Sequence, residues 1–297
     1  MKKNFIAVLM VCAFHMTSQA CDICGCNIAS GFGGILPNFK KNFYGIRYTR
    51  AAYTSEHTGE ATLYKDRSNT FELWGRFYVH PRILLNIALP YNIKKTIGKT
   101  SYSSRGAGDI SLSAGYIIIQ RKTDSGRLQH LFQAGAGIKL PTGAYRLMQS
   151  GSRLPAPLQP GTGSTDILLN TLYIWRKNNS GISNDISYRI NNVNPVDYAF
   201  GNKLSASSRW FFTKKAGKNC NLMPSAGVLL EMMGPSQQYG RQVQDTGGTI
   251  CSSVFGLEIN SRRWVAAAFV NIPLAQNLNH HMTHAQGTLQ INTGFIF

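Results

Sequence analysis

Beyond its first 20 residues, the chain lacks any apolar run long enough to cross a bilayer as a helix. The run at residues 5–14 (FIAVLMVCAF) is itself too short to span. It follows Lys2 and Lys3 and precedes the small-residue cleavage pattern Ser18-Gln19-Ala20. These features predict a secretory signal peptide over residues 1–20. Helical membrane proteins are therefore excluded, and the mature chain is expected to be exported.

Acidic residues are also scarce. The sequence has 13 Asp and Glu against 31 Lys and Arg, a formal charge of +18. Without Lys2 and Lys3 of the leader, the balance is 29 against 13, or +16. Such an excess suits nucleic acid, but an exported chain rarely meets any, so we expect no nucleic-acid partner.

A catalytic arrangement is absent from the sequence pattern as well. An outer-membrane hydrolase would need a nucleophile, a base and an acid converging at one rim. Ser and His residues are present, but no spacing marks such a set. We therefore expect the protein not to be an enzyme.

From residue 43 onward, apolar and polar residues alternate with a period of two, in segments of roughly ten residues separated by turn residues. The twelve segments centre on 43–49, 71–79, 85–93, 110–118, 132–140, 167–175, 186–190, 204–212, 222–232, 251–259, 264–274 and 289–297. This pattern is typical of an all-β, antiparallel transmembrane β-barrel. We expect residues 43–297 to form it, after a Cys-rich N-terminal segment at residues 21–42 that is a candidate plug.

The connections between these segments alternate in length. Short ones are expected at 80–82, 121–128, 176–181, 213–219 and 260–263. Long ones are expected at 54–69, 97–106, 143–164, 192–200, 234–247 and 275–286. A soluble β-sandwich would not show this asymmetry, whereas outer-membrane barrels have short periplasmic turns and longer outer loops. The prediction is a barrel in the outer membrane of a Gram-negative bacterium, with both termini periplasmic.

The last segment supports the same location. Leu289, Ile291, Thr293, Phe295 and Phe297 share one face, and the chain ends on an aromatic residue. Such a strand is what the barrel-assembly machinery commonly recognises. The expected partners are therefore outer-membrane lipid, this machinery through the Phe297 strand, and a small-molecule solute.

The parity opposite to the apolar face predicts the residues of the lumen. They are Arg47, Glu72, Arg76, Asp109, Lys139, Asp166, Asp185, Arg189, Lys203, Arg209, Glu231 and Glu258. A barrel of eight strands is filled by side chains and one of sixteen holds an aqueous channel, so this barrel should be narrow. Paired charges would narrow it further, and small solutes would pass one at a time.

The stretch CDICGC places Cys21, Cys24 and Cys26 at the start of the mature chain. A disulfide is the default outcome in the oxidising periplasm, and Cys220 is within reach as a partner. Zinc or copper binding, or redox sensing, is the second hypothesis, and lipidation of Cys21 is the third. Cys251 is expected to face lipid and to be inert.

A second candidate metal site is the stretch NHHMTHAQ. His280, His281 and His284, with Met282, offer imidazole and thioether ligands suited to copper or zinc. A polar loop of this composition needs no metal to explain it. The two candidate sites fall at opposite ends of the expected barrel, so no cofactor is assigned beyond possible zinc or copper.

Five short motifs carry a resemblance to a known family. They are Leu89-Pro90-Tyr91, Gly106-Ala107-Gly108-Asp109, Lys139-Leu140-Pro141-Thr142-Gly143, Gly161-Thr162-Gly163-Ser164 with Asp166, and Tyr198-Ala199-Phe200-Gly201-Asn202. The chain resembles the "meta-pathway of phenol degradation" family of outer-membrane transporters, which is similar to fatty-acid and aromatic-hydrocarbon channel barrels. The resemblance implies uptake or efflux of small solutes, hydrophobic or aromatic ones among them, and it assigns no residue a role.

Two functions follow. The first is an outer-membrane channel for small solutes; a hydrophobic ligand could leave it sideways where Pro90, Pro224 or Pro273 interrupts strand pairing. The alternative is a barrel that conducts nothing and binds metal or a periplasmic partner through its N-terminal thiols.

Overall fold

The computed structural model describes residues 41–57, 60–99, 101–123, 128–217 and 219–297. The expected signal peptide and the thiols of Cys21, Cys24 and Cys26 lie outside the described residues. Within the described residues, no helix is long and apolar enough to cross a membrane.

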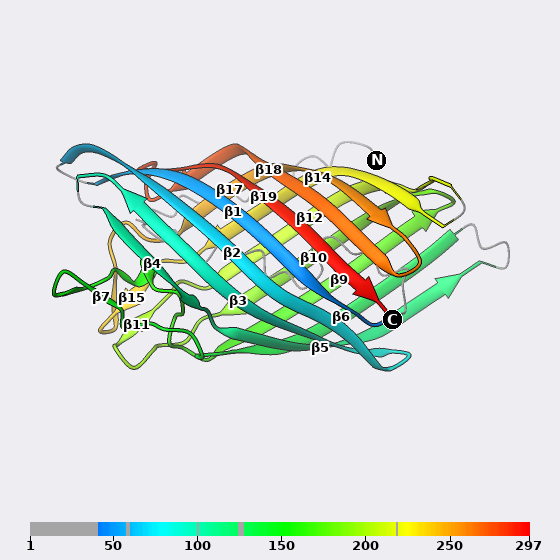
Figure 1. Cartoon of the computed structure of the whole chain (residues 1–297), viewed down its shortest axis with the longest axis horizontal. Coiled ribbons are helices and arrows are strands. Elements are labelled where there is room, and N and C mark those ends of the chain that lie inside the picture. Colours follow the sequence, from blue (N-terminus) through cyan, green and yellow to red (C-terminus); the bar gives the residue numbers. More distant parts are fainter. Residues whose placement is uncertain (1–40, 58–59, 100, 124–127, 218) are drawn as a thin grey trace, which may run out of the picture.

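Twelve long antiparallel strands form a closed barrel, which confirms the predicted fold class (Figure 1). They are β1 (Phe43–His57), β2 (Glu60–His80), β3 (Ile83–Ile97), β5 (Ile110–Lys122), β6 (Leu128–Leu140), β9 (Asp166–Lys177), β10 (Ser180–Ile190), β12 (Lys203–Phe212), β14 (Asn221–Met233), β17 (Gly248–Asn260), β18 (Trp264–Leu278) and β19 (Thr283–Ile296). Each strand pairs with its neighbours in this order, and β1 pairs with β19 to close the ring. Closure leaves no long open edge.

Shorter elements lie in the connections. They are β4 (Tyr102–Ala107), β7 (Met148–Gln149), β8 (Ser152–Arg153), the 3-10 turn η2 (Ala156–Leu158), β11 (Tyr198–Ala199), β13 (Lys214–Lys215), β15 (Gln237–Gln238) and β16 (Arg241–Gln242). All except β13 lie at one end, which we call the long-connection end; the chain terminus Phe297 lies at the other, the short-turn end (Figure 1).

Two of the expected long loops are wrong. Residues 54–69 are mostly strand, because β1 and β2 stay paired through Glu56 and Leu63. Residues 275–286 likewise belong largely to β18 and β19, which are joined by a turn at 279–282. The ladders continue past the apolar belt because interior polar residues go on pairing across the strands, as Ser55 and Thr96 do with Asp66. Polarity at these positions therefore does not signal a loop.

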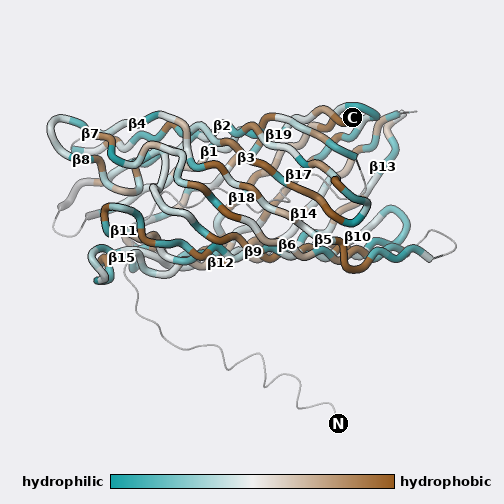
Figure 2. The backbone as a smooth tube through the Cα atoms, turned by 90° about the horizontal axis from the view of Figure 1, so that it is seen from below, coloured by the Kyte–Doolittle hydropathy of each residue, from teal (hydrophilic) through white to brown (hydrophobic). Residues whose placement is uncertain are grey.

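The outer face of the barrel is apolar. On β1, Tyr44 and Ile46 are 56% and 49% exposed, whereas their neighbours Phe43 and Arg47 are 2% and 5% exposed. This alternation places one residue set toward lipid and the other toward the interior. Hydrophobic residues colour the middle of the strands, and the two ends are more hydrophilic (Figure 2).

Parity alone suggested an interior that is polar along the whole barrel. The structure shows that only part of its length is polar. Near the short-turn end, apolar side chains also occupy the inward positions. Two packed clusters there contain Leu172, Ile174, Phe211 and Met223, and Phe43, Trp74, Val265 and Ile296. We call these eight residues the apolar inner layer. Adjacent residues such as Phe211 and Phe212 are both apolar, so the alternation disappears from the sequence where this layer forms.

Candidate functional site

The connection from β6 to β9 folds into the mouth of the barrel at the long-connection end. Lys94, an inward-facing residue of β3, donates from Nζ to the carbonyl oxygens of Pro157 (3.1 Å) and Gln159 (2.7 Å). Asn92 Nδ2 on the same strand donates to Pro160 O at 2.7 Å. The segment 154–160, which we call the inward loop, is therefore held against the interior wall by strand side chains and narrows the mouth.

A buried charge cluster fixes the base of this loop. Lys139 Nζ lies 2.5 Å from Asp166 Oδ2 and 3.2 Å from Asp109 Oδ2. Lys139 and Asp166 stand opposite each other in the β6–β9 ladder, and Asp109 directly precedes β5. All three side chains are almost fully buried. We call Asp109, Lys139 and Asp166 the rim cluster.

Asp109 also ties the two ends of the connection together. Its carboxylate accepts hydrogen bonds from Gly143 N (2.9 Å), Thr162 N (2.8 Å) and Thr162 Oγ1 (2.7 Å). A Cβ placed on Gly161 would lie 2.6 Å from Gly143 Cα, so the two backbones meet only because both residues are glycine. Residues of three sequence motifs therefore converge on one structural feature.

Two further buried ion pairs lie inside the barrel, and we call these pairs together with the rim cluster the charged column. Arg47 Nη1 lies 2.7 Å from Glu72 Oε1, and its guanidinium stacks 4.1 Å above the Trp74 ring. Lys203 pairs with Glu231 at 2.6 Å. These pairs fill the lumen with neutralised charge, so they narrow it without giving it a strong net potential.

The remaining predicted lumen residues are also inside. Arg209 lies 3.6 Å from Asp185. Arg76 Nε donates to Asn86 Oδ1 at 3.1 Å, and Glu258 accepts from Asn260 Nδ2 at 2.7 Å. The structure thus places all twelve predicted lumen residues at buried or half-buried positions. The buried ones are Arg47, Glu72, Arg76, Asp109, Lys139, Asp166, Asp185, Lys203, Glu231 and Glu258, and the half-buried ones are Arg189 and Arg209.

Among the described residues, two further charged side chains face inward that the sequence pattern did not predict. Asp66 is 2% exposed and accepts from Ser55 Oγ (3.0 Å) and Thr96 Oγ1 (2.5 Å). Lys94, 7% exposed, anchors the inward loop. Each lies an even number of residues from a buried inward residue on its own strand, and therefore on the same face. Asp66 shares its face with Glu72, and Lys94 shares its face with Asn92. Following the alternation beyond the apolar belt would have found them.

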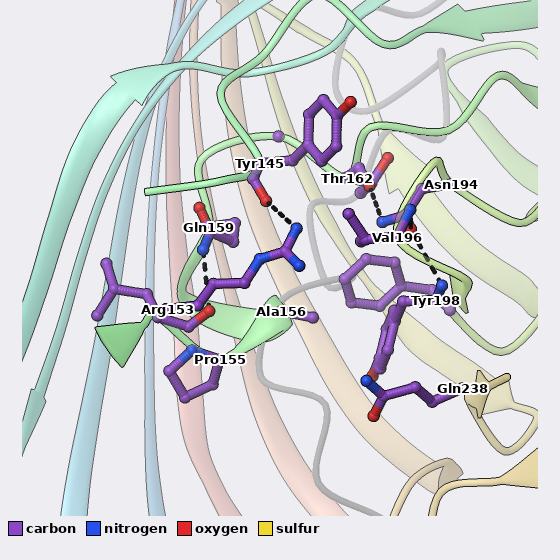
Figure 3. Close-up of a pocket in the computed structure, with 13 residues that line it drawn as sticks. Tyr145, Arg153, Pro155, Ala156, Gln159, Thr162, Asn194, Val196, Tyr198 and Gln238 are labelled. Carbon is purple, nitrogen blue, oxygen red and sulfur yellow. Dashed lines mark hydrogen bonds between the residues drawn. The ribbon is translucent and has the colours of Figure 1, made fainter. Parts of the chain in front are cut away.

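A cavity of about 230 Å³ lies beside the inward loop at the mouth (Figure 3). Three connections build it, namely those before β9, before β12 and at β15. Its lining consists of Tyr145, Arg153, Leu154, Pro155, Ala156, Gln159, Gly161, Thr162, Asn194, Val196, Tyr198, Phe200 and Gln238. We call it the mouth cavity.

Among the described residues, the predicted histidine ligands give no assembled metal site. Across the described ranges, no three His, Cys, Asp or Glu side chains come together in a way that could hold a metal ion. This search included His280, His281 and His284, which lie around the β18–β19 turn. Within the described part of the chain, Cys220 and Cys251 form no disulfide. The three N-terminal thiols, the predicted partners of Cys220, lie outside the described residues.

The prolines differ in their effect on strand pairing. Pro224 continues the β14–β17 ladder opposite Leu257. Pro90 marks the point where β3 changes partner from β5 to β4, and Gly108 N donates to its carbonyl at 2.8 Å. Pro273 lies where the β18–β19 ladder is interrupted between Asn271 and Leu278.

A side chain bridges that interruption. Gln276 Oε1 accepts from Ala285 N at 2.7 Å, and Gln276 Nε2 donates to Ala285 O at 3.3 Å. Of the three proline positions, Pro273 is therefore the one where side-chain bonds take the place of backbone pairing.

Comparisons with known proteins identify the fold. The structure resembles the crystal structure of the COG4313 outer membrane channel from Pseudomonas putida F1, with a TM-score of 0.66 and 13% identity over 89% of this chain and 100% of that chain. The chain has the fold of an outer-membrane β-barrel.

Two other solved structures show weaker similarity. The translocator domain of the autotransporter NalP from Neisseria meningitidis has a TM-score of 0.47 at 14% identity, covering 89% of this chain and 91% of that one. LpxR from Salmonella typhimurium has a TM-score of 0.47 at 9% identity, covering 86% and 100%. No protein-family model and no curated protein matches the sequence.

The anchoring of the inward loop can be tested by proteolysis. We expect Lys94→Met to make the connection several-fold more sensitive to trypsin at Arg146 and Arg153, because the two carbonyls that Lys94 binds lose a charged donor. Cleavage of the folded barrel would be followed on gels over time. Lys95→Met is the matched control, since the adjacent Lys95 side chain is exposed. Equal cleavage rates in both variants would show that Lys94 does not hold the loop.

Proposed function

We propose that the protein is an outer-membrane channel that passes small solutes one at a time. The observation that carries the proposal is the column of buried, paired charges inside a closed barrel, capped at one end by the inward loop and the mouth cavity. A polar interior within an apolar outer belt is the arrangement of outer-membrane channels. The short-turn end, with Phe43 and Ile296, would face the periplasm, and the mouth cavity would face outward.

The interior favours a selective path over bulk diffusion. The inward loop narrows the mouth, and the apolar inner layer packs the other end with residues such as Phe211 (2% exposed) and Leu172 (2% exposed). An apolar constriction opposes hydrated ions by excluding water. Small solutes with apolar surface meet less opposition there, in line with the hydrophobic or aromatic solutes that the resemblance to the phenol-degradation family implies.

The apolar inner layer also favours a second function. A barrel closed by this layer would conduct nothing at rest, and its role would lie in its N-terminal thiols. In that case Cys21, Cys24 and Cys26 would bind zinc or copper, or contact a periplasmic partner. The two functions differ in whether solute crosses the membrane.

Planar-bilayer recordings of the refolded chain starting at Cys21 test these alternatives. They would be made with and without residues 21–42, and with zinc or copper added. Conductance steps that grow on deletion, or that close on metal addition, would support the channel and make the thiol segment its plug. Absence of conductance in every form, together with stoichiometric metal binding to the three thiols, would reject the channel in favour of the sensing function.

A further inference from the structure

We infer that the mouth cavity is a binding site for a small aromatic carboxylate. Small aromatic carboxylates would then be the solutes that the channel passes, and this conclusion rests on the proposed function. The binding itself depends only on the walls of the cavity. It can be measured without any transport.

The size of the cavity limits the ligand to about one ring. Pockets for drug-sized ligands hold about 300–1,000 Å³. The mouth cavity, at about 230 Å³, is smaller than this range. A single ring with a short substituent fits such a volume.

One wall offers aromatic and aliphatic surface. The rings of Tyr198 and Phe200 meet edge to face, with centroids 5.0 Å apart and an interplanar angle of 74°. Leu154, 4% exposed, and Val196 add aliphatic surface. The ring pair leaves edges and faces against which another ring can pack. A flat apolar ligand is therefore favoured over a flexible or strongly hydrated one.

Two amide side chains of the lining, those of Gln159 and Asn194, are already occupied by hydrogen bonds to the scaffold. Gln159 Nε2 donates to the carbonyls of Leu147 (3.1 Å) and Leu154 (2.9 Å). Asn194 Oδ1 accepts from Tyr198 N at 3.0 Å, and its Nδ2 donates to Thr162 O at 2.8 Å. These groups shape the cavity and hold it in a fixed form. They leave little hydrogen-bonding capacity for a ligand.

Arg153 is different. Its guanidinium reaches toward the middle of the lining residues, and Nη2 donates to Tyr145 O at 3.2 Å (Figure 3). Among the described residues lining the cavity, none is acidic. Asp109, which holds Thr162 from behind, is itself paired with Lys139. Arg153 therefore has N–H donors to spare and no carboxylate partner in the cavity, and a carboxylate is the group that a guanidinium binds best.

Calorimetric titration of the folded protein in detergent tests this inference, with benzoate, benzyl alcohol and butyrate as probes. Benzyl alcohol keeps the ring without the charge, and butyrate keeps the charge without the ring. We expect benzoate to bind at least about tenfold more tightly than benzyl alcohol, because one charged hydrogen-bonding pair contributes at least that much. Benzoate should also bind more tightly than butyrate, because its ring packs against Tyr198 and Phe200.

Two variants locate the site. Arg153→Gln should weaken benzoate binding about tenfold and leave benzyl alcohol unchanged. Arg105→Gln is the matched control, because Arg105 is exposed, as Arg153 is, but lies on β4 outside the lining. It should stay within about twofold of the wild type. Phe200→Leu should weaken benzoate and benzyl alcohol together.

The opposite results are equally clear. Equal affinity for benzoate and benzyl alcohol, unchanged benzoate binding in Arg153→Gln, or no benzoate binding by folded wild-type protein would each overturn the inference. Conductance that persists in the absence of benzoate binding would leave the channel standing without this ligand. Benzoate binding by a barrel that conducts nothing would support the site and reject the channel.

Discussion

A Lys139→Met variant is expected to unfold at a markedly lower temperature than the wild type. The change removes the one cation between two buried carboxylates, since Lys139 pairs with Asp166 at 2.5 Å and with Asp109 at 3.2 Å. Breaking a buried pair costs about 3–5 kcal/mol, because the remaining charge is left without compensation. In Lys139→Met two buried carboxylates remain without a cation, and one of them, Asp109, holds the base of the inward loop through Gly143 and Thr162.

Gel mobility of the folded barrel after heating in detergent measures this effect. Lys65→Met is the control, because the exposed side chain of Lys65 on β2 loses the same charge without leaving a buried partner. Adding Asp109→Asn and Asp166→Asn to Lys139→Met should recover part of the lost stability, because two neutral amides replace the two carboxylates that would repel each other without Lys139. An unfolding temperature in Lys139→Met equal to that of the control would refute the structural role of the rim cluster.

The second large effect is expected in conductance. Phe211→Ala should turn a barrel with little ion flow into one with clear conductance steps, because Phe211 packs with Leu172, Ile174 and Met223 in the apolar inner layer. Removing its ring opens a gap that water can enter, and a hydrated constriction passes ions. The same change costs stability, of the order of 3–5 kcal/mol for a buried Phe.

Phe212→Ala is the matched control for this prediction. Phe212 is the next residue on β12, yet its side chain is 36% exposed on the opposite face. Planar-bilayer recordings of both variants, after equal folded fractions are established, make the comparison. Conductance that rises equally in both variants, or in neither, would show that the apolar inner layer is not the barrier.

Much of the fold was predictable because its cause is local. The lipid-facing and inward residues of a strand alternate strictly, so Tyr44, Ile46 and Arg47 could be assigned to their faces from the sequence pattern. The twelve strand centres follow from the same rule. Asp66 and Lys94 were missed because the alternation was followed only within the apolar segments. Beyond these segments the outward residues need not be apolar, so the pattern is weaker there.

The mouth cavity could not be predicted in this way. Its walls join residues that are far apart in the sequence, such as Arg153, Asn194 and Gln238, and their meeting depends on how three connections fold over one another. His280, His281 and His284, by contrast, were conspicuous in the sequence but form no metal-holding group in the part of the chain that the structure describes. Residue type alone suggested a metal site there, but a site also requires the side chains to come together.

The sequence by itself determined the all-β barrel, its strand number and the faces of twelve charged residues, because each of these follows from the period-two contrast between lipid and lumen, although it missed Asp66 and Lys94. Only the tertiary structure decided which of those charges pair, as Lys139 does with both Asp109 and Asp166, and where the long β6–β9 connection goes. Pairing depends on the register between strands, and the path of the inward loop depends on Lys94 and Asn92 reaching its carbonyls from β3. The contacts of Asn92 and Lys94 with the inward loop join residues more than 60 positions apart, a distance over which sequence periodicity carries no information.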